Sequence, residues 1–253
     1  MILGFALIAP VLTVLMWSRM GVAALIFILV SHLLVIYPTL NPLSQWLGPV
    51  MTRFKTKDRR VWLTIDDGPD VNDTPRILDL LDRHAARVTF FVKGESVAGS
   101  PALAREITAR GHTVENHSMS HPSATFWCLP PGKIGAEIDR CSDEIEKATG
   151  RRPRLFRPPV GMKNPFVHPL LRRRSMVLVG WSARGFDGVN TSPETAARRI
   201  LRNVRPGTII LAHQGRFASD GSAVNYRLLE LILASLSEQG YEAVIPDESE
   251  LET

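Results

Sequence analysis

Cysteine is scarce in this 253-residue chain, and charge is nearly absent from its first fifty positions. Its two cysteines, Cys128 and Cys141, are too few for the disulfide framework of a small secreted domain, and we expect plain thiols. Aromatic residues make up only 7%, and none are interleaved with the arginine clusters. We therefore predict no nucleic-acid partner, because single-strand binding needs stacking aromatics among basic residues. With 45% apolar and 22% charged residues, a disordered chain is also excluded.

Two apolar runs fill the start of the sequence. Neither residues 1–17 nor residues 20–37 contain a charged or potentially charged side chain other than one histidine, and each run approaches the roughly 17–20 residues that cross hydrocarbon. A signal peptide would need a basic start and a small-residue cleavage site, and Tyr37–Thr39 is a poor one. We predict that residues 1–50 anchor the chain in a membrane as a hairpin of two transmembrane helices. One long anchor broken at Arg19 is the alternative.

Basic residues follow the second apolar run, whereas Arg19 stands alone between the runs. These residues are Arg53, Lys55, Lys57, Arg59 and Arg60. The positive-inside tendency then favours a cytoplasmic location for the rest of the chain, although part of the cluster can belong to the folded domain. The net charge of +5 also suits a membrane surface. We predict a bacterial-type inner (cell) membrane location and leave the side of the soluble domain open.

From Val61 onward, short β-rich runs alternate with longer segments of helical spacing. The predicted strands are 61–65, 88–92, 113–116, 155–157, 176–181, 208–212 and 242–245. The predicted helices include 75–87, 101–110, 133–149, 193–204 and 225–239. This alternation predicts a single α/β domain over residues 51–253 with a mainly parallel sheet. About seven strands fit a barrel or an open sheet equally well.

Polar residues collect where the predicted strands end, and parallel strands place those ends at one edge of a sheet. Asp66 and Asp67 precede a Gly68-Pro69 turn, and two carboxylates so close are costly without a cation. His117 and His121 follow the third strand with a spacing common among metal ligands. One carboxylate and two imidazoles would suit a catalytic Zn²⁺ or another first-row divalent metal. A solvated turn and two surface histidines are the simpler alternatives.

The later strands end in further polar residues, and the whole set resembles a known family. Arg157 ends the fourth strand, Asp187 follows the fifth, and His213 follows the sixth. The strings resemble the motifs of the polysaccharide deacetylases (NodB homology, carbohydrate esterase family 4) from about residue 61 to 246. T-F-D-D-G-P appears as Thr64–Pro69, H-[ST]-x-x-H as His117–His121, R-x-P-[YF] nearly as Arg157–Val160, and L-x-L-H loosely as Leu211-Ala212-His213.

The resemblance implies a distorted (β/α) barrel and metal-dependent hydrolysis of N-acetyl or other N-acyl groups on an amino sugar. Asp67, His117 and His121 would bind the metal. Asp66 would act as general base on a metal-bound water, and Arg157 would orient Asp66.

The same resemblance assigns the acid and the substrate contacts. His213 would protonate the leaving amine, while Asp187 would orient His213 and keep it charged. Pro159, Trp181 and Leu211 would contact the substrate.

Two departures from the family pattern affect these roles. Val160 stands where an aromatic residue is usual, although its backbone N–H is still available to stabilise an oxyanion. Gly188 follows Asp187 where the family usually has tryptophan.

The expected partners are a membrane and an acetylated amino-sugar glycan or lipid-linked sugar. The aromatic stretch Ala124–Trp127 is expected either to contact substrate or lipid or to pack on the domain. Two other functions remain open: a non-catalytic glycan-binding or scaffold protein, and an amide or ester hydrolase of a non-sugar substrate. The presence of Asp66 with the acid and all three ligands favours an enzyme over a binding protein.

Overall fold

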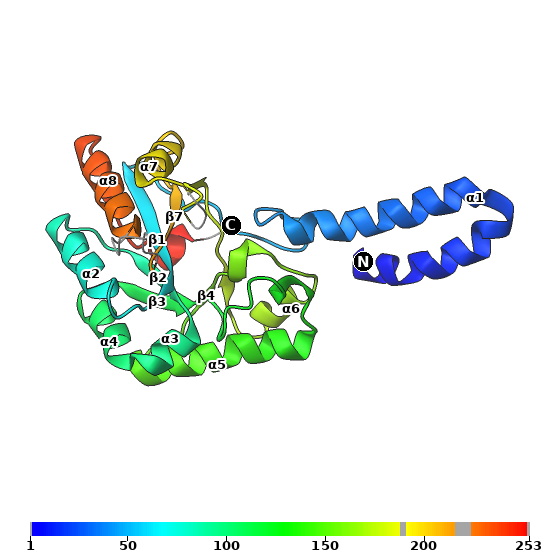
Figure 1. Cartoon of the computed structure of the whole chain (residues 1–253), viewed down its shortest axis with the longest axis horizontal. Helices are drawn as coiled ribbons and strands as arrows, with labels where there is room; N and C mark the ends of the chain where they lie inside the picture. Colours follow the sequence, from blue (N-terminus) through cyan, green and yellow to red (C-terminus); the bar gives the residue numbers. More distant parts are fainter. Residues whose placement is uncertain (1, 188–190, 216–223, 252–253) are drawn as a thin grey trace.

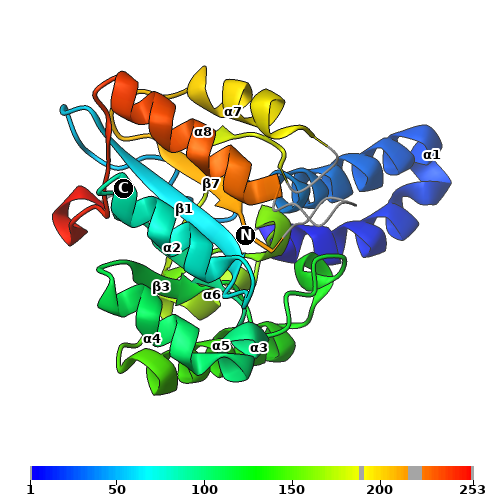
Figure 2. The same cartoon turned by 60° about the vertical axis from the view of Figure 1, so that its left-hand side comes forward.

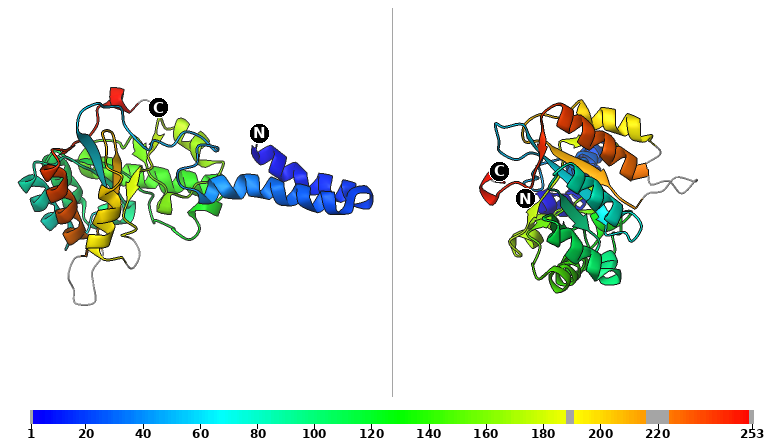
Figure 3. Two further views of the ribbon diagram at one scale, coloured as in Figure 1. Left: turned by 90° about the horizontal axis from the view of Figure 1, so that it is seen from above. Right: turned by 90° about the vertical axis from the view of Figure 1, so that its left-hand side faces the viewer.

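The computed structural model describes residues 2–187, 191–215 and 224–251, and it shows a helical arm projecting from an α/β domain (Figure 1). The arm is α1 (Ile2–Leu40), whose helical backbone breaks at Gly21 with φ 31° and ψ −99°. The two halves turn back along each other (Figures 1 and 3). A break was predicted at Arg19, and the observed break lies two residues beyond it. By length and composition, Gly21–Leu40 could cross a membrane, with a mean hydropathy of 2.2.

Small side chains are the buried ones in α1. Ala9, Thr13, Ala24 and Ser31 are all buried, whereas large apolar side chains such as Val14 are exposed. Small residues permit the close approach of helices that is typical of membrane segments. The large apolar side chains of α1 are therefore left on its surface, and exposed apolar surface of this kind is typical of regions that contact a membrane or another protein.

Seven parallel strands form the main sheet of the domain, in the order β5-β4-β3-β2-β1-β7-β6. They are β1 (Arg60–Gly68), β2 (Thr89–Val92), β3 (Thr113–Asn116), β4 (Leu155–Phe156), β5 (Val177–Leu178), β6 (Ala183–Arg184) and β7 (Ile209–His213). A further strand, β8 (Glu242–Ala243), pairs with the start of β1. The predicted parallel α/β fold is confirmed. β6 was not predicted from the sequence, and the seven predicted strands include β8.

The sheet curls into an incompletely closed barrel, as the family resemblance implied. The chain that leads from α1 into β1 links the two sides of the barrel. Met51 forms a parallel bridge with Val179, just beyond β5, and Arg53 forms an antiparallel bridge with Thr208, just before β7. The segment that precedes the sheet is therefore part of the domain's structure.

Helices surround the sheet, and α2 and α8 cover the β1 side of it (Figure 2). They are α2 (Thr74–Arg83), α3 (Gly94–Gly99), α4 (Pro101–Ala109), α5 (Pro131–Thr149), α6 (Val167–Arg172), α7 (Pro193–Leu201) and α8 (Val224–Glu238), with short 3₁₀ turns η1 (Phe126–Cys128), η2 (Pro159–Gly161) and η3 (Glu248–Glu250). In α2, Ile77, Leu78 and Leu81 lie in the core because they share one helical face. The five predicted helices lie within four residues of their observed ends, whereas α3 and α6 were not predicted.

Most of the basic cluster serves the fold. Arg60 opens β1 and its Nη1 lies 2.6 Å from Oε1 of Glu250. Arg59 donates to the carbonyl of Gln239 at 2.7 Å, and Arg53 is part of the bridge described above. Because these arginines have structural partners, they carry little weight for the positive-inside prediction of a cytoplasmic domain.

Candidate active site

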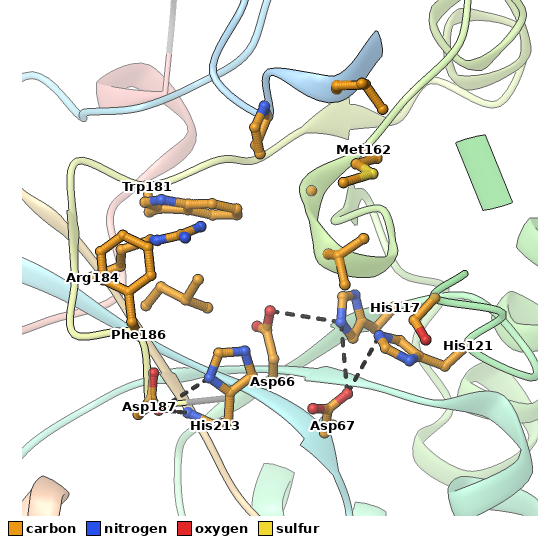
Figure 4. A pocket seen from close by; sticks show the side chains of 16 residues that line it. Asp66, Asp67, His117, His121, Met162, Trp181, Arg184, Phe186, Asp187 and His213 are labelled. Carbon is orange, nitrogen blue, oxygen red and sulfur yellow. Dashed lines mark hydrogen bonds and ion pairs between the residues drawn. The ribbon is translucent and has the colours of Figure 1, made fainter. Parts of the chain in front are cut away.

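A bulge at the end of β1 brings two adjacent carboxylates to the same side. In the pairing with β2, Asp66 is opposite Phe91 and Gly68 is opposite Val92, so the register skips Asp67. Asp67 has φ 75°, a left-handed conformation that non-glycine residues seldom adopt. In a regular strand the two side chains would point to opposite faces. Here both carboxylates line the same cavity (Figure 4).

Asp67 faces two histidines from the loop that follows β3. Its Oδ1 lies 3.5 Å from Nε2 of His121 and 3.8 Å from Nε2 of His117 (Figure 4). For Zn²⁺ bonds of about 2.0–2.1 Å, the edges of a tetrahedron measure about 3.4 Å. Oδ1 of Asp67 is buried and has no hydrogen-bond partner among the described residues. The three groups, with ligand atoms within 4.8 Å of one another, fit a divalent metal ion.

Neighbouring groups and burial keep the candidate ligands in the protonation states that bind a metal ion. His117 donates from Nδ1 to the carbonyl of Arg157 at 2.7 Å, which leaves its Nε2 free to face Asp67. Burial, with a smaller effect of His117, lowers the pKa of His121 to about 4, so its imidazole is neutral at pH 7. Burial alone would raise the pKa of Asp67, but His117 and His121 oppose this and the pKa is lowered.

Arg157 is fully buried beneath the carboxylates and holds Asp66 in place. Its Nη1 donates to Oδ1 of Asp66 at 2.6 Å and to Oγ1 of Thr64 at 2.8 Å. Its Nη2 donates to the carbonyl of Gly180 at 2.9 Å. The other oxygen of Asp66, Oδ2, lies 3.6 Å from Nε2 of His117 and so faces the three candidate ligands.

On the opposite side of the cavity, His213 is paired with Asp187 (Figure 4). Oδ2 of Asp187 lies 3.0 Å from Nδ1 of His213 and also accepts the backbone N–H of His213 at 2.9 Å. Burial lowers the pKa of His213, but the hydrogen bond and charge of Asp187, with Asp66 and Asp67, outweigh it and raise the pKa to about 9. The imidazole is therefore a cation at neutral pH.

A cavity of about 530 Å³ unites these groups. The predicted residues that line it are Asp66, Asp67, His117, His121, Trp181, Asp187, Leu211 and His213. Pro159 is buried and is not among the lining residues, whereas Val160, Gly161 and Met162 are. Val160 has φ 51°, which is unusual for a β-branched residue and is the kind of strain that functional sites retain.

The cavity residues not predicted from the sequence include Leu40, Pro42, Ser123, Gly161, Met162, Arg184 and Phe186. Arg184 and Phe186 lie three residues and one residue before Asp187 in the chain, so a cation and an aromatic ring beside a predicted catalytic residue were an available signal. Leu40 and Pro42 gave no local signal, because their position depends on how α1 meets the domain. The two aromatic residues of the stretch Ala124–Trp127 differ in exposure, because Phe126 is fully buried in the core and Trp127 is 36% exposed.

Comparison with known proteins identifies the family. The model of the polysaccharide deacetylase family matches residues 53–177. A chitooligosaccharide deacetylase from Bradyrhizobium sp. (strain ANU 289) is 33% identical over 193 residues, which cover 73% of this chain and 87% of the relative. The chain belongs to the polysaccharide deacetylase family. This confirms the resemblance seen in the motifs.

Other polysaccharide deacetylase relatives agree in sequence and fold. The peptidoglycan-N-acetylmuramic acid deacetylase PdaA of Bacillus subtilis is 32% identical over 190 residues, covering 74% of this chain and 69% of the relative. The crystal structure of a carbohydrate esterase family 4 pseudoenzyme from Bacillus anthracis matches with a TM-score of 0.69 and 27% identity, covering 80% of this chain and 68% of that one. Because the family includes a pseudoenzyme, membership alone does not make this chain an active enzyme, and its own residues decide whether it is one.

Proposed function

We propose that this chain is a metal-dependent deacetylase that removes N-acetyl, or other short N-acyl, groups from an amino-sugar glycan at a membrane. One observation carries the proposal: Asp67, His117 and His121 face one another in a cavity that also contains the Asp66 and His213 side chains. The relatives described above are named as deacetylases of chitooligosaccharide and peptidoglycan, which supports an acetylated glycan as substrate.

The metal would be held by Asp67, His117 and His121, and the donor set suits Zn²⁺ or another first-row divalent ion. Once bound, such an ion lowers the pKa of a coordinated water toward neutrality and polarises a carbonyl group. Asp66 accepts the proton of the attacking water. Arg157 fixes one oxygen of Asp66, so that the other faces the reacting group.

The leaving amine receives its proton from His213. Asp187 fixes the orientation of that imidazole and holds its pKa near 9, so the acid form is present at neutral pH. The backbone N–H of Val160 serves the oxyanion, and one such donor contributes about 3–4 kcal/mol. Trp181 and Leu211 form walls for the acyl group.

The arm, within residues 1–50, places the catalytic domain (51–253) at an inner (cell) membrane. Its exposed apolar side chains and its buried small residues support a two-helix membrane hairpin. A hairpin returns the chain to the side on which it starts, and the two ends of α1 lie toward the same end of the arm (Figure 1). A compartment-sensitive reporter fused after Thr253 tells which side holds the domain. A signal that changes sides when the first half of α1 is deleted supports the hairpin, and an unchanged signal contradicts it.

Acetate release tests the activity. The full chain, purified in detergent, is incubated with N-acetylated oligosaccharides, and acetate is measured by mass spectrometry before chelation, after chelation and after Zn²⁺ is restored. We expect release that chelation abolishes and Zn²⁺ restores. Asp66→Asn should lose release while Asp143→Asn, on the exposed surface of α5, should keep it. No release by the metal-loaded wild-type chain on any acetylated glycan would contradict the proposal.

A further inference from the structure

One wall of the catalytic cavity is built from the end of the membrane arm. Leu40 is the last residue of α1, Pro42 follows shortly after, and both line the cavity with the catalytic groups. The match to the family model begins only at residue 53, so this wall comes from a segment that precedes the matched region. The catalytic cavity therefore lies where the arm meets the domain.

This wall is fixed by a buried lysine. Lys163 is fully buried, and its Nζ donates to the carbonyl of Asn41 at 3.1 Å and to that of Pro42 at 2.9 Å. Gly161 permits the close approach: it has φ 73°, and a Cβ there would lie 2.7 Å from the Cβ of Pro42. Gly161 follows Val160 in the η2 turn. Pro42, just after the arm, therefore packs directly on the turn that carries the proposed oxyanion donor.

The rim of the cavity is apolar on the side of the arm. Leu40, Val160 and Phe186 line the cavity and are 44%, 45% and 46% exposed. On either side of Leu40 along the chain, Tyr37 and Trp46 are half-exposed, and their ring centroids lie 5.1 Å apart. Exposed Tyr and Trp beside an apolar helix are typical of the membrane–water interface. This apolar surface offers a path for a lipid chain from a bilayer to the cavity.

A cation is held at the same rim (Figure 4). The Cζ of Arg184 lies 3.8 Å from the ring centroid of Phe186 and 5.5 Å from that of Trp181. The Cζ of Arg199 also lies near this ring, 5.7 Å from the centroid of Phe186. Burial lowers the pKa of Arg184, and the nearby charge of Asp187 opposes this shift, whereas no hydrogen bond of the guanidinium is seen among the described residues. Stacking fixes the plane of this guanidinium and leaves its N–H edges for an oxyanion, and phosphate is the group that this geometry binds best.

We propose that the substrate is an N-acyl amino sugar carried on a lipid phosphate or diphosphate. Its lipid lies along Leu40 and Val160, its phosphate binds Arg184, and its acyl group reaches the candidate metal ligands. This inference rests on the proposed deacetylase function and specifies its substrate class. A polymeric glycan that reacts within its length needs a groove open on both sides of the reacting residue, whereas Leu40 and Pro42 form a wall of the cavity here.

The test compares three substrates with the full chain in phosphatidylcholine vesicles, using kcat/KM for acetate release. They are prenyl-diphosphate-linked N-acetylglucosamine, N-acetylglucosamine 1-phosphate and diacetylchitobiose. We expect the lipid-linked sugar to exceed diacetylchitobiose by at least about tenfold, with the soluble phosphate between them. Equal values for the lipid-linked and soluble phosphates would overturn the lipid part of the inference. Equal values for all three would overturn the substrate class but leave the deacetylase function standing. No acetate from any of them would overturn both.

Arg184 provides the second arm of the test. In Arg184→Gln, the ratio of kcat/KM for the lipid-linked sugar to that for diacetylchitobiose should fall by about 10- to 100-fold, the size expected for a lost charge-assisted hydrogen bond. Arg184→Lys should restore part of this ratio. Arg140→Gln, an exposed arginine on α5, should leave the ratio unchanged. An unchanged ratio in Arg184→Gln would overturn the phosphate contact.

Discussion

The contact between Asp187 and His213 predicts a specific shift in the pH dependence of the reaction. The general acid must be protonated, so activity is present below the pKa of His213 and is lost as the pH rises through it. With the pKa raised to about 9, the alkaline limb of kcat/KM should fall near pH 9. In Asp187→Asn the hydrogen bond to a carboxylate is lost, and burial, which lowers the pKa, is opposed only by the remaining acids.

The size of the effect follows from that shift. If the pKa of His213 returns from about 9 to its ordinary value of 6.5, the imidazolium loses about 3 kcal/mol of stabilisation. At pH 7 its protonated fraction then falls from nearly complete to about a quarter, and burial reduces it further. Protonation alone should therefore cost at least about fourfold in rate at pH 7, and misorientation of the imidazole adds to the loss.

The measurement is a pH–rate profile of acetate release from pH 5 to pH 10 for wild type, Asp187→Asn and the surface control Asp143→Asn. We expect the alkaline limb of Asp187→Asn to move toward pH 6.5 or below, with the control superimposed on wild type. Stability should respond in the same direction. Because the folded pKa of His213 exceeds the unfolded one, the stability that Asp187 contributes is complete below about pH 6.5 and is lost as the pH rises through about 9. An alkaline limb that does not move in Asp187→Asn would refute the assignment of His213 as the acid held by Asp187.

Three further substitutions test the surrounding structure. Asp66→Asn should retain the metal but reduce kcat by about 10²–10⁴-fold, and normal turnover would remove Asp66 as the base. Arg157→Met leaves a buried carboxylate without its partner and should lower the free energy of unfolding by about 3–5 kcal/mol in urea titrations; a loss below about 1 kcal/mol would contradict the buried pair. Lys163→Met leaves the carbonyls of Asn41 and Pro42 without their donor and should cost about 1–3 kcal/mol, while faster proteolysis between the arm and the domain should accompany it; unaltered stability and cleavage would show that the lysine does not fix the arm.

The sequence predicted the long, strongly patterned elements of the fold and failed on the short ones. β1 and α5 were recognised because their apolar residues repeat over many positions. β6 has only two residues, Ala183–Arg184, and its pairing with β7 is a tertiary contact that no local pattern records. α3 spans six residues and has glycine at both ends, so its helical propensity is weak. The order of the strands also follows from packing and could not be derived from periodicity.

Within the site, local motifs predicted which side chains meet but not how the chain presents them. The pair Asp66-Asp67 indicated a turn, yet the bulge and the left-handed conformation of Asp67 became evident only in the pairing with β2. The partnership of Asp187 with His213 came from the family resemblance alone. The wall formed by Leu40 was unpredictable, because Lys163 lies 122 residues along the chain from the Asn41 carbonyl that it holds.

The metal content of the purified full chain tests the central claim most directly. Metal atoms per chain are measured by inductively coupled plasma mass spectrometry for wild type, His121→Ala and the control His84→Ala, a half-buried histidine at the end of α2 and outside the cavity. The structure predicts about one divalent ion per chain in wild type and in the control, because three neighbouring ligands form one site, and a sharp loss in His121→Ala. A wild-type chain without bound metal, or equal metal content in all three, would contradict a metal centre at Asp67, His117 and His121.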